Sequence, residues 1–277
     1  MIASTPVLSS FMSRKVLCLS AILLWSATAH GAPGAKELAA YQNASAQLAA
    51  LIASAQDAKD RQQLKTPEVM SLVRTISDEE RLLGTGSYSM AELGTLMGIC
   101  EVANKASMSF ALFDLKSHVD PKGTPQQMQA AVIPLMTRNI VAFQDELQEI
   151  QPFLFRCLAK QIPPMTEFVL SLKPADFTDV RRRGLLGARS GLMQVYAGAI
   201  QSVNEGGLRD DYRNAVLTAL AETAATFASI VELPTRRKMQ EAMLEAASKA
   251  TGQHQLHLTR IATAFGDANC DGLCAIH

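Results

Sequence analysis

The sequence predicts an all-α protein, an antiparallel bundle of about eight helices stapled by disulfides. Apolar residues recur at alternating steps of three and four along most of the chain, and the period-two alternation of a strand is nowhere sustained. The chain is 48% hydrophobic with only 5% aromatic residues, and such a composition favours helix over strand. The turns between helical stretches are short enough for antiparallel neighbours, in one elongated domain or in two lobes.

The first 29 residues have the pattern of a secretory signal peptide. A basic pair, Arg14-Lys15, precedes an apolar region of ten residues, 16–25, and Ala27-Thr28-Ala29 supplies an A-x-A cleavage site before His30. Ten apolar residues are too few to cross a bilayer, because a spanning helix needs about 20. Met12, just ahead of the basic pair, is the expected start of translation. The sequence therefore predicts an exported chain, periplasmic or secreted, after cleavage near Ala29-His30.

Removal of this signal leaves a nearly neutral chain. The full sequence has 26 Lys plus Arg and 26 Asp plus Glu, and the signal contains two basic residues and no acidic ones. The mature chain therefore has a charge of about −2. A nucleic-acid-binding protein is usually basic on one face, so nucleic acid is not an expected partner. The single Trp, Trp25, leaves with the signal, which excludes Trp-based stacking platforms and interface anchors.

The helices of the first half have recognisable start and stop signals. An apolar seam predicts a helix over residues 36–58, and Thr66-Pro67 has the cap-then-proline pattern that begins the next one. The glycine-containing stretch 82–89 predicts a break. Ser89 and Glu92 then have the spacing of a capping box at the start of a long helix.

Prolines divide the middle of the chain. Thr124-Pro125 repeats the cap-then-proline start, and the apolar spacing continues this helix to about Ile150, with a kink at Pro134. Pro152 and the pair Pro163-Pro164 then bound a short apolar helix, because proline is disfavoured in a helix interior.

Three further helices complete the predicted domain of residues 30–265. The first follows Pro174 and ends at Gly206-Gly207. The second extends from Leu208 to Leu233. The last begins at Thr235 and extends to about Phe265, with a weak point at Gly252. Residues 266–277 form a cysteine-containing C-terminal tail.

Four cysteines remain after removal of the signal, and an even count in an exported chain predicts disulfides. Cys270 and Cys274 can close locally, since Gly272 permits a tight turn. Cys100 would then pair with Cys157, and this pairing is the favoured one. The alternative joins one of the two tail cysteines to Cys100 or Cys157, which would staple the tail onto the bundle.

Metal binding has two candidate sites, and neither is favoured. A zinc clip made of Cys270, Cys274 and His277 has suitable ligand types, but it lacks a fourth ligand, and an oxidising compartment disfavours free thiolates. His254 and His257 share one helix face, but the E-x-x-H pattern of helical di-metal sites is absent, so polar surface histidines are the favoured interpretation. We predict neither a metal nor a cofactor.

A cluster of basic side chains offers a surface for anions or for an acidic partner. Arg181, Arg182, Arg183 and Arg189 lie on one predicted helix, and Arg182 and Arg189 are seven residues apart on the same face. Guanidinium groups at this spacing could hold a phosphate, a lipid headgroup or an acidic protein surface. Asp179 is placed to pair with Arg182 and Arg183, however, so a solvated charged face is the favoured alternative.

Two G-x-x-x-G patterns, Gly94/Gly98 and Gly187/Gly191, predict close helix–helix packing inside the bundle. Neither G-x-S-x-G nor H-E-x-x-H occurs, and no motif brings Ser, His and Asp together. Catalysis is therefore not the favoured function. We predict a non-catalytic binding protein of the cell envelope with a protein partner, such as a toxin-neutralising protein, an inhibitor or an adaptor. The alternatives are an exported enzyme whose site assembles only in three dimensions, and a carrier of a small hydrophobic molecule.

Overall fold

The computed structural model describes residues 32–120, 122–267, 270 and 272–276, and all regular secondary structure in this part of the chain is helical. The predicted all-α class is therefore confirmed. The predicted signal peptide, residues 1–29, lies outside the described residues. No helix in the described part is both long and apolar enough to span a membrane.

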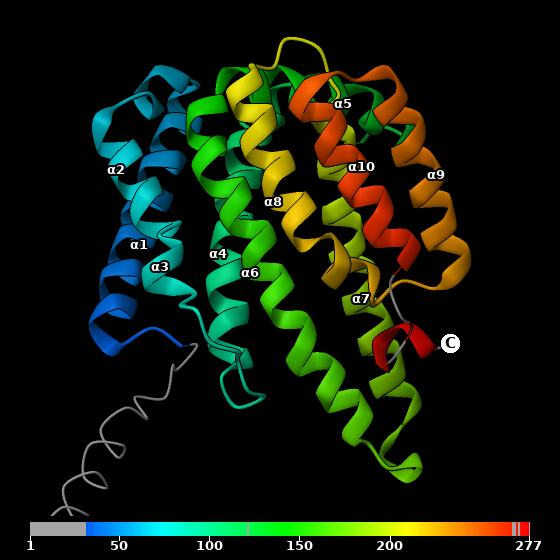
Figure 1. Cartoon of the computed structure of the whole chain (residues 1–277). Coiled ribbons are helices and arrows are strands. Elements are labelled where there is room, and N and C mark those ends of the chain that lie inside the picture. The colour runs from blue at the N-terminus through cyan, green and yellow to red at the C-terminus, as the bar shows by residue number, and fades with distance from the viewer. Residues whose placement is uncertain (1–31, 121, 268–269, 271, 277) are drawn as a thin grey trace, which may run out of the picture.

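The helices form a row with α5 and α7 added to it (Figure 1). The row begins with α1 and α2, continues through α4, α6 and α8, and ends with α10 and α9; α5 lies across the top, and α7 lies behind α8. In chain order the α-helices are α1 (Ala35–Ala58), α2 (Pro67–Ile76), α3 (Glu79–Leu82), α4 (Leu93–Ala111), α5 (Pro125–Ala142), α6 (Gln144–Ser171), α7 (Asp179–Ser202), α8 (Asp210–Ala228), α9 (Leu233–Lys249) and α10 (Gly252–Asp267). Short 3-10 turns are η1 (Arg61–Leu64), η2 (Leu115–Ser117), η3 (Pro174–Asp176) and η4 (Gly272–Ala275).

Side-chain caps mark several helix starts where the sequence predicts them. The Thr66 hydroxyl accepts the Val69 N–H at the start of α2. Thr124 and Gln127 form a full capping box at the start of α5. The predicted box at Ser89 is incomplete, because the Ser89 hydroxyl donates to the Glu92 carboxylate at 2.7 Å instead of accepting a backbone N–H, and α4 begins only at Leu93.

The central helix α6 contradicts the prediction of a short helix between prolines. It is continuous from Gln144 to Ser171 and contains Pro152, Pro163 and Pro164. Its neighbours include α2, α4, α5, α8 and η4, so both sides of it are buried. Burial of Phe153, Leu154, Phe155 and their neighbours offsets the backbone hydrogen bonds that the prolines remove.

The chain breaks at Phe143, where the sequence predicts an uninterrupted helix to about Ile150. Phe143 leaves the helical conformation at φ −112° and ψ 28°, and it is fully buried. Its ring packs against Phe110 at 5.1 Å and Phe113 at 5.7 Å between ring centroids. The turn between α5 and α6 therefore directs the Phe143 ring into the core. A continuous helix would direct this ring elsewhere.

The predicted last helix is two helices. Gly252 adopts a left-handed φ of +59°, and the chain reverses there between α9 and α10. Reversal packs α10 against both α9 and α8 and buries Leu258, Ile261 and Phe265. The preceding helix α8 likewise ends earlier than predicted, at Ala228, and α9 begins at Leu233 with Pro234 in its first turn.

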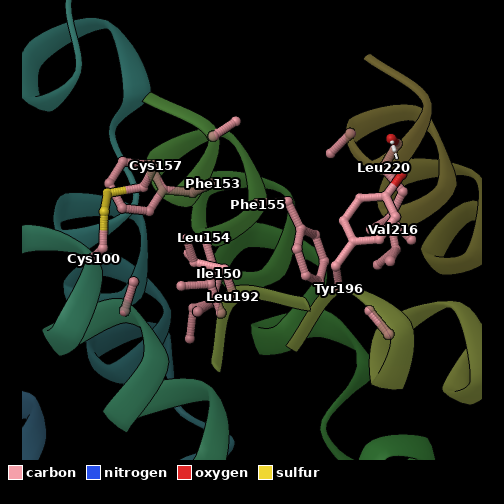
Figure 2. Close-up of a cluster of buried hydrophobic side chains, with 14 of the residues drawn as sticks. Cys100, Ile150, Phe153, Leu154, Phe155, Cys157, Leu192, Tyr196, Val216 and Leu220 are labelled. Carbon is pink, nitrogen blue, oxygen red and sulfur yellow. Dashed lines mark hydrogen bonds between the residues drawn. A yellow bond between two sulfur atoms is a disulfide. The ribbon is translucent and has the colours of Figure 1, made fainter. Parts of the chain in front are cut away.

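Both disulfides have the predicted pairing (Cys100–Cys157 in Figure 2). Cys100 of α4 is joined to Cys157 of α6, with 5.6 Å between the Cα atoms, and Cys270 closes locally onto Cys274. One hydrophobic cluster extends past them from Tyr41 in α1 to Ile276 at the C-terminal end. In Figure 2, Phe155 on α6 lies beside Tyr196 of α7, whose hydroxyl donates to the Leu220 carbonyl of α8 at 2.7 Å.

Candidate binding groove

A groove lies over α6, between α7 on one side and α4 and α5 on the other. It consists of two adjoining hollows of about 290 and 190 Å³, which share Met136, Ile140, Gly198 and Ser202. Its floor is formed by Leu154 and Phe155 of α6 together with Gln151. Apolar side chains also lie at the rim, where Met108 and Ile133 are 40% and 52% exposed. Methionine side chains adapt to different shapes, so this lining suits an apolar ligand surface.

Polar groups without partners converge at the floor of the groove. The Tyr212 hydroxyl donates to Gln151 Oε1 at 2.7 Å, which leaves the Gln151 amide nitrogen as a free donor. Ser107 of α4 lines the same hollow, and its side chain is buried. Among the described residues, neither the Ser107 hydroxyl nor the Gln151 nitrogen has a further hydrogen-bond partner. Both groups are open to the groove, so each can form a hydrogen bond with a ligand that carries polar atoms as well as apolar ones.

The lining of the groove offers apolar contacts and hydrogen-bonding groups. Within the described lining, Glu205 at one end is the only side chain that titrates, and the other polar groups are amides and hydroxyls. General acid–base catalysis needs a proton donor and acceptor within reach of the substrate. Here the single carboxylate has no second ionisable group beside it in the lining, whereas apolar contacts and hydrogen-bonding amides are abundant.

The helix α7, which forms one wall, corrects the interpretation of the G-x-x-x-G patterns. A Cβ atom added at Gly187 or Gly191 would meet nothing within 4 Å, and the same holds for Gly94 and Gly98 on α4. The predicted close packing of these glycines inside the bundle is therefore wrong. Gly187 and Gly191 face outward because α7 packs through the opposite face, where Leu185, Leu192 and Tyr196 are buried.

The structure separates the predicted arginine cluster into different roles. The Arg189 guanidinium donates to the carbonyls of Leu273, Cys274 and Ile276 and to the Glu232 carboxylate, so it holds the C-terminal segment. Because these contacts occupy its guanidinium, Arg189 is not available to the predicted anion-binding surface. The sequence could not indicate it, because the carbonyls lie more than 80 positions along the chain.

The other three arginines lie near the beginning of α7. Arg182 pairs with Asp179 at 3.1 Å, as the sequence predicts. Arg181 lies over the Phe168 ring, 5.7 Å from its centroid, and also donates to the Asp176 carbonyl. Arg183 is exposed and forms no ion pair with a described residue.

Of the two histidines of α10, His257 is buried, contrary to the prediction of surface residues, and His254 is half-buried. His257 is only 7% exposed, and its Nε2 lies 3.4 Å from the Thr218 hydroxyl of α8. His254 Nε2 and His257 Nδ1 are buried without a hydrogen-bond partner in the described structure. Burial is the main cause that lowers the pKa of both rings, assisted for His254 by Arg213 and for His257 by Arg260. Asp210 and Glu222, respectively, oppose this shift.

Metal ligation finds little support among the described residues. They contain no group of three or more His, Cys, Asp or Glu side chains placed to hold a metal ion. The proposed zinc clip loses two ligands, since Cys270 and Cys274 are joined to each other. Its third member, His277, lies outside the described residues.

A basic hollow of about 240 Å³ elsewhere has a structural explanation. Lys59, Arg61, His118 and Arg138 line it, and the Arg138 guanidinium donates to His118 Nε2 at 3.0 Å. The C-terminal ends of α1, α4 and α5 all meet at this place. Helix C-termini carry partial negative charge, so cations are stabilised there without any ligand.

Comparison with protein-family models, with curated proteins and with solved structures finds no match for this chain.

Proposed function

We propose that this chain is an exported, non-catalytic binding protein that holds a segment of a partner protein in the groove over α6. The observation that carries this proposal is the lining: exposed and half-buried apolar side chains, including Met108 and Met136, surround unpartnered amide and hydroxyl groups. Apolar anchors around a few hydrogen-bonding groups are characteristic of peptide-binding grooves.

The groove fits a protein segment better than the two alternative functions. A carrier of a small hydrophobic molecule needs an enclosed cavity that shields most of its ligand from water. These two hollows are open to solvent along one side, and their rim residues Met108 and Ile133 are exposed. An enzyme needs reacting groups, and the described lining contains one carboxylate, Glu205, at its end.

Export is supported by the covalent framework. Every cysteine in the described residues is joined in a disulfide, and disulfides persist in oxidising compartments such as the periplasm and the exterior. The A-x-A pattern ahead of His30 supports the same location. A site in the cell envelope agrees with a role as an adaptor, an inhibitor or a toxin-neutralising protein.

A variant that fills the groove tests this function. Gly198 lines both hollows, and a Cβ added there meets nothing within 4 Å, so Gly198→Phe should fill the groove without disturbing the fold. Gly94→Phe is the matched control, because Gly94 is equally open but does not line the groove. The mature protein and both variants are used to capture proteins from the native envelope fraction.

We expect the wild type and Gly94→Phe to retain the same partner and Gly198→Phe to lose it, with all three chains showing equal helicity. Capture that is identical for the three chains would refute the assignment of the groove.

A further inference from the structure

Four glycines form an exposed row along α7. Gly184, Gly187, Gly191 and Gly198 are spaced by three, four and seven residues, which places them on one helix face. A Cβ atom built on any of the four would meet nothing within 4 Å. The row therefore has no neighbour in the described part of the chain.

The fold itself does not require these glycines. None of the four has the left-handed backbone that favours glycine, in contrast to Gly207 and Gly252. None is pressed against another element. Glycine in a helix interior destabilises the helix relative to alanine, so a row of four is unfavourable unless something outside the chain makes use of it.

The glycine row continues the wall of the groove. Gly198 belongs to both, and Gln194, Val195 and Ser202 on the same face of α7 line the groove as well. An independent observation points to a ligand here: Ser107, 6% exposed, lines the groove with a hydroxyl that has no partner among the described residues. The open face of α7 and the groove thus form one continuous surface.

We propose that the occupant of this surface is an α-helix of the partner protein, which lies along α7 and meets the glycine row with small residues of its own. The inference rests on the proposed function and specifies its partner. Glycine lets two helix backbones approach closely, as small residues do in other helix pairs. The opposite side of the docked helix would carry the apolar residues that fill the methionine-lined hollows.

Charge at the two ends of the row sets the direction of the docked helix. Arg183 lies at the N-terminal end of this face and Glu205 just beyond its C-terminal end, and neither side chain forms an ion pair with a described residue. A helix carries partial positive charge at its N-terminus and partial negative charge at its C-terminus. Both ends are stabilised if the docked helix starts near Glu205 and ends near Arg183, which is antiparallel to α7. The span corresponds to a helix of about 20 residues.

The free helix of a partner fits this surface better than α7 of a second copy. A helix in the groove is contacted from two sides, by α7 and by α4 and α5. It must therefore have two free faces. In this chain α7 is packed against α8 and η4, so only its glycine face is free.

The test is selection of peptides from a displayed library of 20-residue alanine-based helices, randomised on one face, against the whole mature chain. We expect selected peptides to carry Gly, Ala or Ser at positions four and seven apart. They should bind the Gly191→Leu variant about tenfold more weakly or worse, because the added side chain occupies the contact. Their affinity for the matched control Gly94→Leu should stay within about twofold of the wild type.

A photo-crosslinking group on either end of a selected peptide reports the direction. We expect the N-terminal label to react near Glu205 and the C-terminal label near Arg183; the opposite result would overturn the antiparallel arrangement. Glu205→Lys should weaken binding several-fold at low salt and have little effect at high salt.

Three further outcomes would overturn the docking of a partner helix on the glycine row, and they differ in what they imply for the proposed function. Peptides that lack small residues and tolerate Gly191→Leu, but still lose binding to Gly198→Leu, would show that the groove binds a segment in another form. Peptides insensitive to both variants would refute the groove as well. A dimer in gel filtration that Gly191→Leu dissociates would identify a second copy of this chain as the occupant.

Discussion

Replacement of Arg189 by alanine is expected to release the C-terminal segment from the bundle. The Arg189 guanidinium donates to the carbonyls of Leu273, Cys274 and Ile276 at 3.1, 3.3 and 3.0 Å, and to the Glu232 carboxylate at 2.6 Å. Without this donor, a segment that stays docked would keep three unpaired carbonyls, at about 1–3 kcal/mol each, whereas water pairs with them when the segment detaches. Detachment is therefore the cheaper response.

The cost of detachment sets the magnitude. Exposure of Leu273 and Ile276, which are buried in the native chain, costs about 1.5–3 kcal/mol each. The regained freedom of the released residues offsets part of this cost. We expect Arg189→Ala to lower the free energy of unfolding by about 2–4 kcal/mol. Arg183→Ala is the control, and it should change stability by less than about 0.5 kcal/mol.

Urea unfolding followed by circular dichroism measures this difference, in the full chain and in a chain truncated after Asp267. If Arg189 stabilises the protein through the C-terminal segment, Arg189→Ala should cost less than about 1 kcal/mol in the truncated chain, where only the Glu232 pair remains. An equal loss in both backgrounds would refute the reasoning, because the two changes would then act independently.

Three other expectations follow from other parts of the structure. Replacing both Cys100 and Cys157 by Ala should lower the free energy of unfolding by about 4 kcal/mol, since the bond closes a loop with a sequence separation of 57; a loss below about 1 kcal/mol in urea unfolding would contradict this. The melting temperature should fall as the pH drops below the ordinary histidine pKa of 6.5, because the buried His257 ring has a lowered pKa and the unfolded chain binds the proton more tightly. His257→Gln should weaken that dependence, and an unchanged profile would exclude it. Gly187→Ala and Gly191→Ala should each raise the free energy of unfolding by about 0.5–1 kcal/mol, and destabilisation by either would show that the glycine serves the fold.

Features that depend on a few neighbouring residues could be predicted from the sequence. The starts of α2 at Thr66 and α5 at Thr124 follow from a side chain that caps a backbone N–H three positions on. The local closure of Cys270 onto Cys274 follows from Gly272, which adopts the left-handed φ of +61° that a tight turn requires.

Features that depend on tertiary burial could not be predicted from the sequence. Pro152, Pro163 and Pro164 predict helix ends from local rules, but α6 passes through all of them because it is packed between other helices on both sides. The break at Phe143 is the reverse case, since local spacing favours a helix there and the aromatic pocket favours a turn. In both, burial of apolar surface outweighs the local preference.

The candidate groove has no local signature in the sequence, because its lining comes from helices spread over about a hundred residues. The G-x-x-x-G pattern at Gly187 and Gly191 indicates a special face of α7, and in a chain of this composition it predicts internal packing. The pattern alone does not say whether the partner of such a face lies inside or outside the chain. The open space beside each glycine decides that question.

The groove and the C-terminal segment are connected through α7. This helix is held by α8 along its buried face and by η4, and Arg189 projects from it to bind the segment that contains η4. Because its glycine face has no neighbour in the described chain, these contacts on the opposite side fix where the wall of the groove lies. The Cys270–Cys274 bond shortens the free loop of that segment and favours the turn whose carbonyls accept from Arg189. The C-terminal disulfide therefore helps to hold in place α7, the helix that a partner would contact.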